Sequence, residues 1–226
     1  MTPLASLIAA NIAFVGSHFV MSHPMRAGLV RAVGAKGFLG VYSLVSLALF
    51  AWIVMAFRQV GPGGEVLWDG TSTVIWTIAS LLTVLAMVLL LGSFKGNPAV
   101  PDAPASLAEA EPAGALRVTR HPMMWGVAIW AVSHMLVMPT PRTLVTAGAM
   151  LVLALLGAHL QDGKKEGLMG EAWKGWESRT SFWPRWSALG AIPLTIWLAG
   201  IAAWLLATWL HVWLAYVPAG IWRSAL

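Results

Sequence analysis

Two histidines lie inside strongly apolar stretches of this chain, where an ionisable side chain is costly. His18 belongs to the run at residues 3–22, and His134 belongs to the run at residues 122–139. Neutral imidazole is a common metal ligand, and two imidazoles from different helices can hold the iron of a porphyrin inside a bundle. Alternatively, each ring only hydrogen-bonds a neighbouring helix, which contributes about 1 kcal/mol. Both positions are therefore candidate metal ligands.

Two further histidines lie where apolar runs end or begin. His23 and His121 are each followed by proline, and each is close to an arginine, Arg26 or Arg120. Arginine binds carboxylates through paired, charge-assisted hydrogen bonds, so these arginines are candidates for neutralising the acidic groups of a cofactor. Ordinary snorkelling of the side chains to the membrane surface is the alternative.

The chain contains no cysteine. This excludes disulfides, thiolate-ligated haem, iron–sulfur clusters and cysteine-based zinc sites. A metal or cofactor iron would have to be held by the 6 His, the 11 Met or the few carboxylates. Of the remaining histidines, His159 and His211 close two other apolar runs, and we expect them to be structural or interfacial.

The composition places these residues in a membrane protein. Of the 226 residues, 58% are hydrophobic and only 10% are charged, whereas a soluble domain carries about a quarter charged residues. A soluble enzyme, a disordered chain and a nucleic-acid binder are therefore excluded. The net charge of +5 is consistent with basic loops that face anionic lipid.

Long apolar runs predict an all-α bundle in a single domain covering residues 1–226. Each run is close to the length of about 20 residues that a hydrocarbon core requires. The six predicted spans are residues 3–22, 38–57, 73–92, 122–139, 143–160 and 190–214.

The distribution of Lys and Arg predicts the orientation of these spans. Eleven of the 14 Lys and Arg residues fall in the first, third and fifth connections. The positive-inside rule therefore predicts that these connections are cytoplasmic and that both termini lie on the other side. We expect a multi-pass protein of a bacterial inner membrane.

The depths of the two buried histidines differ under this arrangement. Counted from Arg26 and Arg120 as interface markers, His18 is 8 residues deep and His134 is 14 residues deep. At 1.5 Å per residue these depths are about 12 and 21 Å. A shared iron would need helix tilt or a displaced boundary to bring the two rings level.

The sequence resembles the NnrU family of membrane proteins over nearly its whole length. The resemblance rests on two blocks that contain histidine, Ser17-His18 with Ser22-His23-Pro24-Met25-Arg26, and Arg117-Val118-Thr119-Arg120-His121-Pro122 leading to Trp130-Ala131-Val132-Ser133-His134. It implies a link to denitrification, that is, to nitrite and nitric oxide metabolism. The family is similar to the plant 15-cis-zeta-carotene isomerases, which use haem b with histidine ligands. That likeness implies His18 and His134 as ligands, although Ala131 stands where the plant pattern has Cys.

A weaker resemblance connects the chain to the isoprenylcysteine methyltransferases. The residues that carry it are Arg120-His121-Pro122, followed by Glu166, Gly170, Trp173, Trp176 and Pro184. It implies binding of S-adenosylmethionine (SAM) at the cytoplasmic face. We take it as shared architecture more than as shared chemistry.

The leading hypothesis is a membrane protein that binds haem b between its first and fourth spans. The predicted cofactor site comprises His18 and His134 as metal ligands, with Arg26, Arg120, His23 and His121 around them. The expected partners are membrane lipid and an apolar substrate, whose double bond is isomerised, or nitric oxide. The alternatives are a SAM-dependent membrane methyltransferase and a non-enzymatic accessory factor of a reductase complex.

Overall fold

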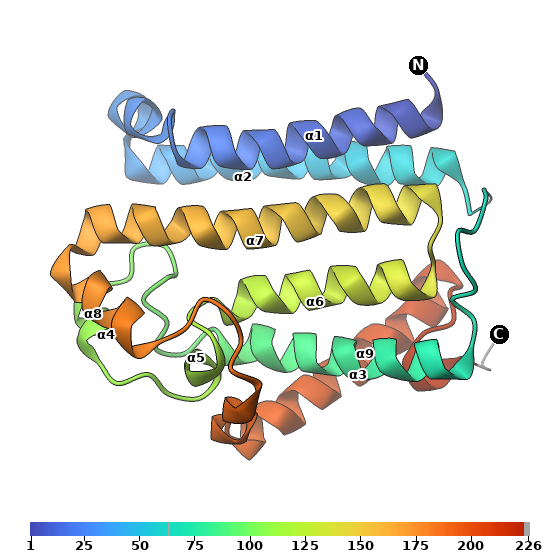
Figure 1. The fold of residues 1–226 in the computed structure, drawn as a ribbon. Coiled ribbons are helices and arrows are strands. Elements are labelled where there is room, and N and C mark those ends of the chain that lie inside the picture. Colours follow the sequence, from blue (N-terminus) through green and yellow to red (C-terminus); the bar gives the residue numbers. More distant parts are fainter. Residues whose placement is uncertain (63, 224–226) are drawn as a thin grey trace.

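The computed structural model describes residues 1–62 and 64–223, and helices are the only regular structure in this part of the chain (Figure 1). The long helices are α1 (Pro3–Ser22), α2 (Arg26–Val60), α3 (Thr73–Gly92), α6 (Pro122–Val137), α7 (Pro141–Met169) and α9 (Leu194–Ala215). The connections carry α4 (Ser106–Glu109), α5 (Ala115–Val118), α8 (Glu171–Arg179), η1 (Trp186–Ala191) and η2 (Gly220–Trp222). The prediction of an all-α bundle is confirmed.

The long helices pack in a spatial order that differs from their order in the chain. Helix α1 packs on α2 and α7, α7 packs on α6, α6 packs on α3, and α3 packs on α9. Helix α7 therefore separates α1 from α6, and no contact between α1 and α6 occurs in the described residues (Figure 1). We call the end of the bundle that carries α4, α5 and α8 the loop end. The start of α1 and η2 lie at the opposite end.

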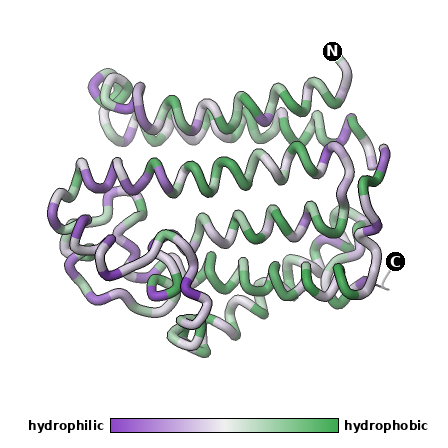
Figure 2. Tube along the Cα trace, viewed as in Figure 1, coloured by the Kyte–Doolittle hydropathy of each residue, from purple (hydrophilic) through white to green (hydrophobic). Residues whose placement is uncertain are grey.

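Five of these helices are long and apolar enough to cross a membrane: α1, α2, α3, α7 and α9. Hydrophobic residues follow the helices, while hydrophilic residues gather at the loop end (Figure 2). The predicted span 122–139 forms helix α6, but α6 is not among the five candidate spans, because its 16 residues rise only about 24 Å against a core of about 30 Å. It ends early because Pro139 and Pro141 cannot continue a helix.

Two of the observed helices are clearly longer than the spans predicted from the sequence. Helix α2 begins at Arg26 instead of residue 38, with a kink at Gly34, whose positive φ of 74° suits glycine. Helix α7 continues past residue 160 and ends at Met169. It is capped by Gly170, where φ is 56°. The polar extension of α7 at the loop end supplies part of the site described below.

Small residues and interhelical hydrogen bonds hold the row of helices together, as is typical of packing in lipid. A Cβ atom added to Gly126 of α6 would lie 2.8 Å from the Ala86 carbonyl oxygen of α3. Between α9 and α3, Trp204 donates from Nε1 to Thr83 Oγ1 at 2.9 Å. These contacts fix the spacing of α6, α3 and α9.

Candidate functional site

A buried ion cluster joins the start of α6 to the polar end of α7. The Asp162 carboxylate accepts hydrogen bonds from Arg120 Nε at 3.0 Å and from Arg120 Nη2 at 2.7 Å. Its Oδ1 also lies 2.7 Å from His121 Nε2, which donates to it. The His121 side chain is 2% exposed and that of Asp162 is 11% exposed. We call Arg120, His121 and Asp162 the Asp162 clamp.

Local backbone structure explains why the clamp forms. Pro122 begins α6, so Arg120 and His121 precede the helix in non-helical backbone. Helices α6 and α7 form an antiparallel hairpin, which returns the chain to the same level at Asp162. Arg120 Nη2 also lies 3.1 Å from Glu177 Oε1 on α8. The clamp thus connects three helices at the loop end.

The segment after α8 covers the clamp. The Phe182 carbonyl accepts hydrogen bonds from Thr119 Oγ1 at 2.8 Å and from Trp125 Nε1 at 2.9 Å. The Phe182 ring centroid lies 5.8 Å from that of His121 and 5.7 Å from the Arg120 guanidinium carbon. This aromatic cover keeps water from one side of the ion cluster, which strengthens its electrostatic interactions.

Beside the clamp lies a hollow of about 520 Å³, which we call the His23 hollow. It is lined by residues from α7 and α8, from the end cap of α1 and from the approach to α6: His23, Arg120, His159, Leu160, Asp162, Gly163, Lys164, Glu166 and Glu177. The Nε2 atom of His23 is buried and has no hydrogen-bond partner among the residues that the structure describes. A buried polar atom of this kind calls for a partner.

The charges around the His23 hollow are mixed. Arg120 and Lys164 are cationic, whereas Asp162, Glu166 and Glu177 are anionic. The imidazoles of His23 and His159 add ring nitrogens that can donate or accept hydrogen bonds. The hollow can therefore bind a small polar molecule that carries both donors and acceptors.

Three of the six predicted cofactor-site residues converge here. His23 and Arg120 line the hollow, and His121 holds the Asp162 wall. Arg26 lies at the start of α2, with its guanidinium 5.5 Å from the Phe38 ring centroid. The convergence of His23, Arg120 and His121 was predicted only as part of a larger cofactor site.

The structure does not bring His18 and His134 together. The His18 ring lies against Phe14 and Tyr42, and its Nε2 is 3.5 Å from Ser46 Oγ, so it faces α2. The His134 ring lies on Trp130, to whose carbonyl oxygen its Nδ1 is hydrogen-bonded at 2.8 Å. Because α7 packs between α1 and α6, these two rings do not sandwich one iron.

The donor set does not fit a haem placed between α1 and α6. Arg120, predicted to neutralise a propionate, is already paired with Asp162 and Glu177. The predicted ligand pair and the predicted propionate partner are therefore engaged elsewhere.

Sequence reasoning did not identify four contributors: Asp162, His159, Lys164 and Glu177. The signal for Asp162 was present, since Arg120 lies two residues before one predicted span and Asp162 lies two residues after the next. A tight hairpin places such residues at the same depth. Of the methyltransferase-like residues, Glu166 lines the hollow, whereas Trp173 and Trp176 are buried against Ala108 and Leu116.

Comparison with known proteins confirms the resemblance found in the sequence. The family described as NnrU protein matches residues 6–219, which is nearly the whole chain. No curated protein and no solved structure matches the chain. The chain, with its row of apolar helices and its ion cluster at the loop end, belongs to the NnrU family.

Proposed function

We propose that this NnrU-family membrane protein acts through the His23 hollow, where it binds a small polar ligand, and that it contributes to nitrite and nitric oxide metabolism. The observation that carries the proposal is the convergence of His23, Arg120, His159 and Glu177 on the wall formed by Asp162. These residues come from four separated segments. Removing charged groups from water is costly, and the clamp fixes the geometry of one wall before any ligand binds.

The lining of the hollow suggests the class of ligand. Neighbouring cations and carboxylates suit a molecule with groups of both signs, and the volume is in the range of small-molecule pockets. His23 Nε2 is the buried donor or acceptor that such a ligand would satisfy. The assignment to nitrite and nitric oxide metabolism is supported by membership of the NnrU family, from which the link to denitrification is inferred.

A second candidate is a SAM-dependent membrane methyltransferase. One observation favours it, namely that Arg120 and Glu166, which carried that resemblance, line the same hollow. SAM bears an amino-acid zwitterion and a sulfonium cation, so mixed charges would suit it. The burial of Trp173 and Trp176 away from the hollow argues against this candidate.

We also propose that the loop end faces the cytoplasm of a bacterial inner membrane. The positive-inside rule supports this orientation, because the segments at residues 93–121 and 161–193 are rich in Lys and Arg. A ligand would then enter the His23 hollow from the cytoplasm.

Complementation tests the leading proposal. In a denitrifying host that lacks its own copy, His23→Gln and His159→Gln are compared with His211→Gln, which makes the same change on α9. We expect nitrite consumption or nitric oxide turnover to fall severalfold in the first two variants and to match wild type in the third, at equal protein levels in the membrane. Wild-type rates in both hollow variants would refute the proposal.

Haem b stays a prediction from the resemblance, and an absorption spectrum tests it. From the separate surroundings of His18 and His134, we expect His18→Ala and His134→Ala to leave the visible spectrum of the purified protein unchanged. A Soret band that disappears in both variants would restore the paired ligands. Calorimetric binding of SAM that is lost in Glu166→Gln would favour the methyltransferase candidate.

A further inference from the structure

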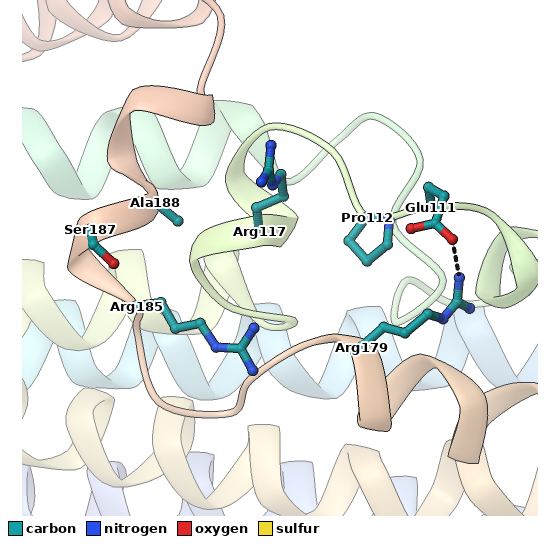
Figure 3. Close-up of a pocket in the computed structure, with 7 residues that line it drawn as sticks. All are labelled: Glu111, Pro112, Arg117, Arg179, Arg185, Ser187 and Ala188. Carbon is teal, nitrogen blue, oxygen red and sulfur yellow. Dashed lines mark hydrogen bonds and ion pairs between the residues drawn. The ribbon is translucent and has the colours of Figure 1, made fainter.

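A second hollow at the loop end is strongly basic. It has a volume of about 580 Å³ and is lined by Glu111, Pro112, Arg117, Arg179, Arg185, Ser187 and Ala188. Figure 3 shows that its three arginines come from separate segments, namely α5, the end of α8 and the approach to η1. We call it the arginine hollow. Its residues are distinct from those of the His23 hollow.

Arg179 is held in place by backbone oxygens. It donates from Nη2 to the Ala108 carbonyl at 2.6 Å, from Nη1 to the Ala110 carbonyl at 3.0 Å, and from Nε to the Gly175 carbonyl at 3.0 Å. Carbonyl groups carry no net charge, so they orient the guanidinium without neutralising it. Its one ion-pair partner in the described chain, Glu111, is 3.3 Å away with a side chain 88% exposed, and such a pair is weak.

The other two arginines retain unused donors. Arg185 donates from Nη2 to the Thr180 carbonyl at 3.2 Å, and its own backbone N–H is hydrogen-bonded to the Val118 carbonyl. The guanidinium of Arg117 has no hydrogen-bond or ion-pair partner in residues 1–62 and 64–223. The lining of the hollow therefore holds three positive charges and a single carboxylate, Glu111, which pairs with Arg179 (Figure 3).

We propose that the arginine hollow binds a phosphate group. The planar fork of a guanidinium matches phosphate oxygens with two parallel hydrogen bonds, and the Ser187 hydroxyl adds a donor at the edge of the hollow. The phosphate can belong to an anionic lipid headgroup or to a soluble phosphate compound. Both present the same oxygens to the arginines that line the hollow.

The surroundings of the hollow favour the lipid source. Trp183 and Trp186 flank Arg185 in the chain, with exposed fractions of 67% and 48%. Indole side chains settle at the headgroup level of a bilayer. The apolar helix α9 begins at Leu194, shortly after η1. The hollow therefore lies close to the level where lipid phosphates are found.

The test titrates the full chain in detergent with short-chain phosphatidylglycerol and with inorganic phosphate, and follows the intrinsic tryptophan fluorescence. Arg117→Gln is the principal variant, because the Arg117 guanidinium makes no hydrogen bond or ion pair within the described part of the chain. Arg58→Gln, an exposed arginine outside the hollow, removes the same charge as a control.

We expect Arg117→Gln to weaken binding about tenfold, the usual scale for losing a charged hydrogen bond, and Arg58→Gln to leave it unchanged. Binding of the lipid alone identifies a headgroup site, and binding of inorganic phosphate as well identifies a site for soluble phosphates. Absence of binding by both probes would overturn the proposal. Equal effects of the two substitutions would also overturn it, because they would indicate attraction by net charge only.

Discussion

Replacing Asp162 by Asn removes the negative charge of the Asp162 clamp while keeping the size of the side chain. In the native protein, the Asp162 carboxylate accepts hydrogen bonds from Arg120 and His121, whose side chains are 13% and 2% exposed. Removing one partner of a buried ion pair costs about 3–5 kcal/mol, since the remaining charge is left uncompensated. Because Asn keeps one acceptor oxygen and the Asp162 side chain is 11% exposed, we expect a loss at the lower end, about 3 kcal/mol.

Glu177→Gln is the matched control. It also removes one carboxylate charge that faces Arg120. However, the Glu177 side chain is 31% exposed, and exposed ion pairs contribute about 1 kcal/mol or less. For a chain of this size, each kcal/mol lowers Tm by about 2–4 °C. Thermal unfolding of the protein in detergent, followed by circular dichroism, should therefore show a fall of about 6–12 °C for Asp162→Asn and about 4 °C or less for Glu177→Gln.

Equal Tm values for the two variants would refute the argument that burial makes the clamp strong. A double-mutant cycle with Arg120→Gln sharpens the test. If Arg120 and Asp162 interact as described, the loss in the double variant is smaller than the sum of the two single losses. Additive losses would show that the two side chains do not act as a pair.

Three further predictions concern packing and orientation. Gly126→Leu should destabilise the bundle by about 1–3 kcal/mol, because its side chain would meet the neighbouring backbone of α3. Thr83→Val should cost about 1 kcal/mol in unfolding free energy, because the Trp204 indole loses its acceptor. The chain contains no cysteine, so in intact cells a membrane-impermeant maleimide should label Glu65→Cys, whereas Ser178→Cys should react only after permeabilisation.

Matched variants separate these effects from general damage. Gly148→Leu should be tolerated, since a Cβ atom there meets nothing within 4 Å. Thr77→Val on the same helix as Thr83 should change stability less, because among the described residues the Thr77 hydroxyl is hydrogen-bonded to the Thr73 carbonyl of its own helix and to no other helix. Equal losses of stability in Gly126→Leu and Gly148→Leu, or in Thr83→Val and Thr77→Val, would contradict the packing argument. Labelling of Ser178→Cys in intact cells would reverse the proposed orientation.

Much of the Asp162 clamp was within reach of sequence reasoning. Pro139 and Pro141 favour a tight turn between two apolar runs, and a tight turn places Arg120 and Asp162 at similar distances from it. A carboxylate and an arginine at the same depth form a pair because neither is stable alone near the hydrocarbon. The part that the sequence did not reveal is the contribution of Glu177, because α8 returns to the clamp through a turn at Gly170.

The predicted pairing of His18 with His134 was not found, which shows that the order of helices in the chain does not determine which helices are neighbours. Both residues were correctly placed on apolar helices, yet the two rings face different neighbours. The positions of the helices follow from local composition, because the transfer of each apolar run into lipid depends on its own residues. Which helices become neighbours does not follow from local composition. Lipid tails are as apolar as the helix surfaces, so no hydrophobic stripe marks the face of a helix that contacts another helix. Close contacts such as that at Gly126 decide the neighbours, and they exist only once the helices have packed.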